Sequence, residues 1–256
     1  MSRMLGRRPA RFDARFPRFT AVTDALPDPP AFANWYADVP AWHTLGNDFC
    51  GDCVIAAALH QTLQMTSYLH PGHAKQPTDT EAVNSYAAIT GYVRGKPATD
   101  QGTYVMGRGG LIEHWMKNGL HCGGVLNKPT AVVQITRPEP RHWQQAIGTF
   151  GSVMFGIDLP QSIADSDPLP FVWRDASGPV AGGHEILAVG YQTVSGTSLY
   201  DCITWGERVR LTEEFLLAVF SEAVCVYNGM ASLDARGINP AGIGDAVLRA
   251  SINLFE

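Results

Sequence analysis

Residues 47–53 read Asn-Asp-Phe-Cys-Gly-Asp-Cys, and the chain continues from Val54 to Leu69 as VIAAALHQTLQMTSYL. This continuation contains no glycine or proline, and small or apolar residues occupy most of the helical turn, which is typical of a buried helix. Cys53 therefore stands at the amino end of a predicted helix. Unpaired backbone amides and the helix dipole at such an end lower the pKa of a thiol and favour its nucleophilic thiolate.

A histidine lies far downstream, at the start of a predicted strand. Gly182-Gly183-His184 precedes EILAVGYQ, a short apolar run of strand character. A thiolate nucleophile needs a proton-accepting histidine, and the two glycines let a substrate or a facing lobe approach closely. The interval from Cys53 to His184 is 131 residues, which is within the range of one class of Cys–His enzymes.

Three short motifs in this order resemble those of papain-like cysteine peptidases. Residues 47–54, N-D-F-C-G-D-C-V, resemble the family's Q-G-x-C-G-x-C-W, and residues 184–191, H-E-I-L-A-V-G-Y, resemble its H-A-V-x-x-V-G-Y. Residues 203–206, Ile-Thr-Trp-Gly, match the second half of the family's N-S-W-G. The resemblance covers the chain from Asn47 to Gly206 and implies a papain-like α+β fold.

The resemblance also implies roles for individual residues. Cys53 would be the nucleophile and His184 its general base and acid, through a thioester acyl-enzyme. Asn47, where the family has glutamine, would form the oxyanion hole with the Cys53 backbone amide. Trp205 would shield the histidine, and Gly183 would lie beside the substrate. We expect a peptide or protein substrate and no metal or organic cofactor.

Some positions depart from the family's motifs. Ile203 occupies the place of the asparagine that orients the histidine, and an isoleucine side chain cannot accept a hydrogen bond. Thr204 faces the opposite side of a strand, and Asp201 lies about 7 Å away on the Ile203 side. Glu185 replaces an apolar residue and would raise the pKa of His184 if it pointed inward. A poorly oriented dyad and a loss of peptidase activity both stay open.

Five cysteines, an odd number, are too few for a disulfide scaffold and favour a reducing compartment. Cys50 and Cys53 form a Cys-x-x-Cys pair, which could be a redox pair or half of a zinc site completed by His121-Cys122. The lead-in rich in proline and tryptophan lacks the strand that a thioredoxin-like redox pair requires. The papain-like resemblance allows a Cys50–Cys122 bridge without requiring one.

Composition limits the class of protein. The chain has 256 residues, of which 45% are hydrophobic and 17% charged, with a net charge of −5, and its mean hydropathy is −0.05. These values exclude a disordered chain, and no apolar run is long enough to cross a membrane. Residues 1–18 contain six arginines and one aspartate, a balance of +5, so the remainder carries −10. The acidic remainder argues against nucleic-acid binding, except through the basic residues.

Helical patterns precede strand patterns along the chain, which favours α+β architecture over alternating βαβ units. We expect a basic, flexible arm at 1–25 and a single papain-like catalytic domain at 26–256. Within that domain, a helical lobe at about 45–125 packs against a β-rich lobe at about 130–235, with the site in the cleft and an extension to 256. No secretory signal is evident, so a cytoplasmic location is predicted.

Two alternatives to a peptidase stay open. One is a thioester-based acyltransferase or ligase, because an amine can intercept the same intermediate that water hydrolyses. The other is a non-catalytic papain-fold structural or binding protein of a phage or prophage. The sequence predicts no oligomeric state.

Overall fold

The stretch after Asp52 forms the helix that its sequence predicts. In the computed structural model, which describes residues 3–228, 236–239 and 244–246, α1 spans Cys53–Leu69 and is buried along nearly its whole length. It packs against the long strand β7 (Val180–Val194) of the main sheet. A helix buried on almost every side needs the small and apolar residues that this stretch provides.

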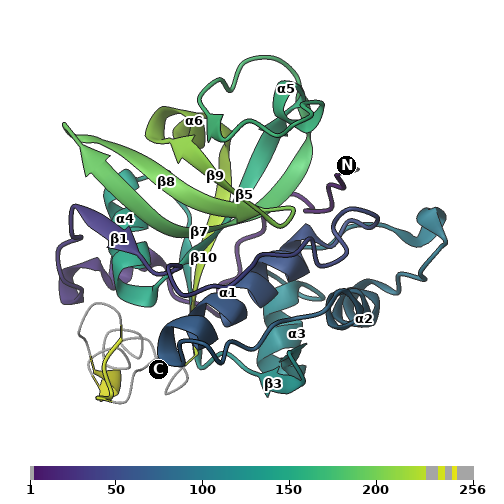
Figure 1. Cartoon of the computed structure of the whole chain (residues 1–256), viewed down its shortest axis with the longest axis horizontal. Coiled ribbons are helices and arrows are strands. Elements are labelled where there is room, and N and C mark those ends of the chain that lie inside the picture. Colours follow the sequence, from purple (N-terminus) through teal and green to yellow (C-terminus); the bar gives the residue numbers. More distant parts are fainter. Residues whose placement is uncertain (1–2, 229–235, 240–243, 247–256) are drawn as a thin grey trace.

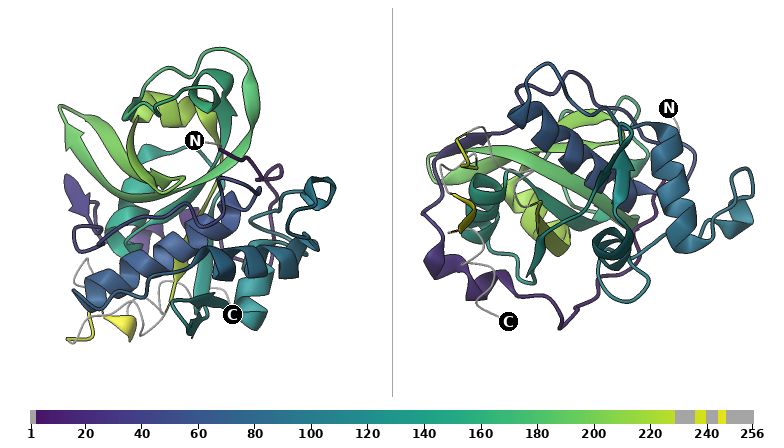
Figure 2. Two further views of the ribbon diagram at one scale, coloured as in Figure 1. Left: turned by 45° about the vertical axis from the view of Figure 1, so that its right-hand side comes forward. Right: turned by 90° about the horizontal axis from the view of Figure 1, so that it is seen from below.

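Two further helices and a hairpin complete the helical lobe. The helix α2 (Asp79–Thr90) begins with a capping box formed by Thr78 and Glu81, and α3 (Leu111–Asn118) ends at Gly119, whose φ is +79°. The hairpin consists of β2 (Leu120–Cys122) and β3 (Val125–Asn127). Figures 1 and 2 show these elements gathered with α1 on one side of the sheet.

The main sheet has the order β4-β10-β5-β7-β8-β9-β6, with β1 paired to β7. Its pairs are antiparallel except β6 with β9. Besides β7, its strands are β1 (Phe32–Asn34), β4 (Ala131–Ile135), β5 (Val153–Pro160), β6 (Val172–Trp173), β8 (Thr197–Thr204), β9 (Glu207–Thr212) and β10 (Phe220–Tyr227).

The two faces of this sheet pack into different cores. On β7, Leu187 and Val189 face α1 and the helical lobe, whereas Ile186 and Ala188 face the other core, because successive strand residues point to opposite faces. That other core is covered by α4 (Pro140–Phe150) and α6 (Glu213–Val219). The remaining short helices are α5 (Gln161–Ala164) and the 3-10 turns Phe19–Ala21, Thr23–Ala25 and Pro97–Thr99.

This architecture confirms the predicted α+β fold, with helices packed against a β-rich half. The helix α4 and the strands β4 and β9 were not among the predicted elements. Residues 229–235 of the predicted β-rich lobe, and most of the extension to 256, lie outside the described residues. In the part of the chain that the structure describes, no helix is both long and apolar enough to span a membrane.

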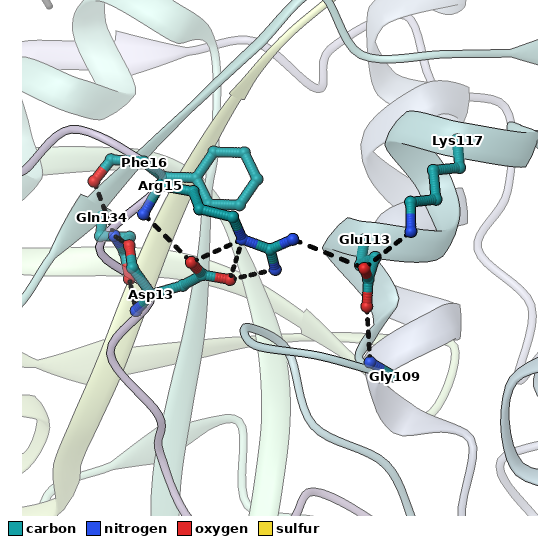
Figure 3. Close-up of polar contacts among 7 residues, drawn as sticks. All are labelled: Asp13, Arg15, Phe16, Gly109, Glu113, Lys117 and Gln134. Carbon is teal, nitrogen blue, oxygen red and sulfur yellow. Dashed lines mark hydrogen bonds and ion pairs between the residues drawn. The ribbon is translucent and has the colours of Figure 1, made fainter.

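Specific hydrogen bonds hold part of the basic amino-terminal stretch, which the sequence predicts as a flexible arm at 1–25. Figure 3 shows how Gln134 holds it: the Gln134 side chain accepts from the Asp13 amide at 3.0 Å and donates to the Asp13 and Phe16 carbonyls. Arg15 contacts Glu113 of α3, which also pairs with Lys117. Polar groups of this stretch therefore have specific partners far along the chain, and its flexibility stays a prediction.

Candidate active site

Cys53 is the first residue of α1 and is only 1% exposed. Burial raises the pKa of the Cys53 thiol to about 12, and the charges of Glu185 and Asp52 add to the rise. Hydrogen bonds from the main-chain amides of Glu185 and Gly6 act in the opposite direction and lower this pKa. The sequence predicted a lowered pKa from the helix end alone. The pKa is raised and not lowered because the chain's own residues, and not water, surround the sulfur.

The His184 ring is held on two sides. Its Nε2 lies 2.7 Å from the Thr204 hydroxyl, and its plane stacks on Trp205 with ring centroids 4.1 Å apart and 15° between planes. Its Nδ1 is buried and has no hydrogen-bond partner among the described residues. Burial, and then the positive charge of Arg7, lower the pKa of His184 to about 3, so the imidazole is neutral at pH 7.

Thr204, and not Ile203, is the hydrogen-bond partner of the His184 ring. Ile203 pairs with Leu187 in the β7–β8 register and packs into the helical-lobe core. His184 points to the face of the sheet opposite to Leu187, and Thr204 points to the face opposite to Ile203. The threonine, and not the isoleucine, therefore contacts the imidazole. Glu185 does not raise the pKa of His184, which is lowered.

Asn47 and Trp205 meet at one carbonyl oxygen. The Asn47 Nδ2 donates to the Met4 carbonyl at 3.3 Å and to the Cys50 carbonyl at 3.1 Å, and the Trp205 Nε1 donates to the same Met4 oxygen at 3.2 Å. Asn47 is 1% exposed. Its amide is therefore aimed into the site and already donates to a peptide carbonyl.

Residues 4–8, which we call the cleft segment, lie in extended conformation over this site. The Met4 amide donates to the Asn47 carbonyl at 3.0 Å, and the Arg7 amide donates to the Gly183 carbonyl at 3.2 Å. On the other side, the Thr103 amide donates to the Gly6 carbonyl and the Arg8 amide to the Thr103 carbonyl, both at 2.8 Å. Hydrogen bonds from the helical lobe and from β7 thus hold the main chain of the cleft segment.

Glycines make this close contact possible. A Cβ on Gly183 would lie 2.4 Å from the Arg7 carbonyl oxygen, and one on Gly102 would lie 2.3 Å from the Gly6 oxygen. The prediction that Gly183 permits a close approach is consistent with this geometry. Around the segment runs a groove of about 710 Å³, lined by Phe49, Tyr92, Asp100, Gln101 and Gly182 among others.

Cys50 takes no part in a disulfide. All five cysteines are free, the Cys50 thiol donates to the Gly46 carbonyl at 3.4 Å, and the Cys122 thiol donates to the Lys75 carbonyl at 3.2 Å. Among the described residues, no group of three or more His, Cys, Asp or Glu side chains is arranged to hold a metal ion. The Cys-x-x-Cys spacing therefore carries no bridge here.

All five predicted site residues surround the cleft segment. Asn47 and Trp205 bind Met4, Gly183 binds Arg7, Cys53 is faced by the Gly6 amide, and His184 feels the Arg7 charge. Sequence reasoning missed Arg7 and its acidic partners Asp158 and Glu222. A single arginine among six near the amino end carries no local signal that distinguishes it.

Comparison with solved structures places this architecture among papain-like cysteine proteases. Xylellain, a cysteine protease from Xylella fastidiosa, superposes with a TM-score of 0.69 and 14% identity over 89% of this chain and 98% of that chain. A procathepsin B from Trypanosoma congolense gives 0.59 and 9% over 88% and 86%, and a recombinant stem bromelain precursor gives 0.53 and 14% over 86% and 75%. The chain has the papain-like fold. No family model and no curated protein sequence matches it.

Proposed function

We propose that the protein is a cysteine peptidase that acts on extended peptides through Cys53 and His184. The observation that carries this proposal is the cleft segment itself. A peptide main chain lies over Cys53, hydrogen-bonded to Gly183 on one side and Thr103 on the other. A groove that hydrogen-bonds the main chain of its own segment has the donors and acceptors needed to bind the main chain of a substrate in the same way.

The proposed mechanism assigns the proton transfer to the His184 Nδ1, which has no hydrogen-bond partner among the described residues, the Cys53 thiol included. With Thr204 accepting from Nε2–H, the free Nδ1 of His184 takes the Cys53 proton. The thiolate attacks the scissile carbonyl carbon, while the Asn47 amide and the Cys53 backbone amide hold the oxyanion. His184 then protonates the leaving amine, and a water molecule, deprotonated by the same imidazole, hydrolyses the thioester. An amine in place of that water would give acyl transfer.

The described state is a resting one. With the pKa of Cys53 raised to about 12 and that of His184 lowered to about 3, both groups are neutral at pH 7. Both shifts arise chiefly from burial, and the cleft segment contributes to that burial. We propose that turnover begins only when the segment leaves the cleft.

A covalent probe tests the proposal. The Gly6→Ala chain, in which the new Cβ would lie 1.8 Å from the Gly51 carbonyl oxygen and the segment has to leave the cleft, is incubated with a peptidyl epoxide or vinyl sulfone. The modified residue is identified by mass mapping. Modification of Cys53, with Cys202 and Cys225 unmodified as buried internal controls, is the expected result. Cys53→Ala and His184→Ala should each abolish cleavage of a broad peptide library while the melting temperature stays near that of the parent. Cleavage that survives both substitutions would refute the mechanism.

A non-catalytic papain-fold protein is the second candidate, and the raised pKa of Cys53 favours it. Such a protein would keep its thiol covered under all conditions. One measurement distinguishes the two candidates. In a peptidase the probe modifies Cys53 once the segment is displaced, whereas in a non-catalytic protein it does not.

A further inference from the structure

Three residues stand side by side across β10, β5 and β7 close to His184. Gly156 of β5 is paired with Glu222 of β10 on one side and with Glu185 of β7 on the other. Directly paired residues of neighbouring strands point to the same face. Glu222 and Glu185 form the two walls of a notch, and Gly156, which has no side chain, forms its floor.

Arg7 of the cleft segment fills this notch. A Cβ on Gly156 would lie 2.8 Å from the Arg7 Cδ and 2.8 Å from the Glu222 Cγ. Any larger residue at 156 would therefore collide with the arginine stem. The missing side chain at this position creates the space that the Arg7 side chain occupies.

The guanidinium is buried among acceptors. The Arg7 side chain is 1% exposed, and its Nη2 donates to the Asp158 carboxylate at 2.8 Å and to the Ile157 carbonyl at 3.1 Å. Its Nη1 donates to the Glu222 carboxylate at 3.3 Å and to the Arg8 carbonyl at 3.2 Å. This planar, multidentate set of acceptors suits a guanidinium better than an ammonium.

The notch holds more carboxyl groups than one arginine contacts. Glu185 is 3% exposed, and neither of its carboxylate oxygens has a hydrogen-bond partner among the described residues. A buried carboxylate without a partner is destabilising, so such groups are rarely kept without a cation nearby. Burial raises the pKa of Glu185 well above its usual value, so the selectivity of the notch for a positively charged occupant rests on Asp158 and Glu222, which pair with the guanidinium.

We propose that this notch is a specificity pocket for an arginine side chain of peptide substrates, and that Arg7 occupies it in cis. The inference rests on the proposed function, whose substrate class it names. It places the selected arginine next to the residue that faces Cys53, because the neighbouring Gly6 supplies the amide that faces the sulfur.

The contacts of Arg7 are those of a bound ligand more than those of a structural ion pair. Its main chain belongs to an extended segment that is hydrogen-bonded to Gly183 beside His184. An arginine that served only to stabilise the fold would not have to belong to a segment that lies in the groove.

Binding measured without catalysis tests the pocket. The variant Arg7→Ala/Cys53→Ala, which has an empty notch and no nucleophile, is titrated by calorimetry with blocked hexaalanine peptides that carry one arginine at each position in turn. The matched peptides carry citrulline, which has the same shape without the charge. We expect one position at which arginine binds about tenfold or more tightly than citrulline.

Further variants separate the pocket from general attraction to an acidic protein. Glu222→Gln and Gly156→Ala should each remove the preference for arginine, whereas Asp175→Asn, at an exposed acid elsewhere, should leave it unchanged. Equal binding of arginine and citrulline peptides at every position would overturn the proposal. If Arg7→Ala does not fold, Arg7→Met, which keeps the aliphatic stem, replaces it. If neither folds, the Gly6→Ala/Cys53→Ala chain is titrated with the same pairs, because a Cβ on Gly6 would lie 1.8 Å from the Gly51 carbonyl oxygen and the segment with Arg7 has to leave the groove. Equal binding of the two peptides there overturns the proposal.

This design keeps the two proposals apart. An inert papain-fold protein would still prefer arginine over citrulline in these titrations, because no bond is broken. An active peptidase whose cleavage ignores arginine would retain the proposed function and lose only the pocket.

Discussion

The backbone amide of Arg7 donates to the carbonyl of Gly183, the residue immediately before His184, over 3.2 Å. This hydrogen bond ties the amino-terminal stretch to the strand that carries the proposed base. Together with the Met4 contacts to Asn47 and Trp205, it closes the groove above Cys53. Access to the sulfur is therefore controlled by residues of the same chain.

Displacing the cleft segment should expose the Cys53 thiol. A Cβ on Gly6 would lie 1.8 Å from the Gly51 carbonyl oxygen, so Gly6→Ala cannot be accommodated with the segment in place. Water would then reach the sulfur, and its pKa would fall from about 12 because burial is the largest cause of the rise. We expect iodoacetamide to alkylate Cys53 at pH 7 about tenfold or more faster than in the unchanged chain.

Cys202 and Cys225 serve as internal controls in that experiment, since both are buried in the sheet away from the segment. Their labelling should stay slow in both proteins. Equal labelling of all three cysteines would indicate general unfolding, and an unchanged Cys53 rate would show that the segment does not control access.

Thr204 should act as a positioning residue for the imidazole. Thr204→Val keeps the side-chain shape but removes the oxygen 2.7 Å from the His184 Nε2. The ring then loses its orienting partner, and we expect kcat on a peptide substrate to fall about tenfold to a hundredfold with little change in KM. Leaving the buried nitrogen unpaired should also lower the free energy of unfolding by about 1–3 kcal/mol.

Thr204→Ser is the matched control, because it retains the hydroxyl and loses only a methyl group. Its pH–rate profile should follow that of the unchanged enzyme, whereas the profile of Thr204→Val should shift. Identical profiles and rates for the valine and serine variants would remove Thr204 from the mechanism.

Local signals account for what the sequence predicts well. The glycine-free run after Asp52 identifies α1, because the buried faces of a helix are set by neighbouring residues. The resemblance of three ordered motifs selects Cys53, His184 and Asn47, each of which has an interaction with the cleft segment. Each of these predictions depends only on the residue types within a short stretch of sequence.

The rest depends on pairings between distant residues. Arg7 meets Asp158 and Glu222 across 151 and 215 positions, and nothing near Arg7 distinguishes it from the other arginines of a basic stretch. Motif alignment placed Ile203 where asparagine is expected, but strand register decides which side chain meets His184. Register is set by the whole sheet, so Thr204 emerges only from the structure.

Asn47 should stabilise the transition state more than the bound substrate. Its Nδ2 already donates to a peptide carbonyl, that of Met4. Asn47→Ala should lower kcat about a hundredfold and leave KM nearly unchanged, as expected for the loss of one oxyanion donor. Alkylation of Cys53 needs no oxyanion hole and should be at least as fast as in the parent. A rise in KM with unchanged kcat would instead assign Asn47 to substrate binding.

His60 should make the fold sensitive to acid. It is buried in α1, with Nε2 at 2.9 Å from the His43 carbonyl oxygen, and burial lowers its pKa from 6.5 to about 4. Between these values the unfolded chain binds a proton that the folded chain does not, so stability falls as the pH falls from 6.5 to 4. Glu222 acts in the opposite sense, because burial raises its pKa to about 7.

Comparison with His60→Gln isolates the histidine, because glutamine can still donate to the His43 carbonyl but does not titrate. Urea unfolding at pH 7 and pH 4.5 gives the loss of stability for each protein. The unchanged chain should lose about 2 kcal/mol more than the variant over this interval, since one pKa unit corresponds to about 1.4 kcal/mol. The contribution of Glu222 is common to both proteins and cancels in the difference. Equal losses would mean that His60 is not neutral in the folded protein, or that its proton is taken up without unfolding.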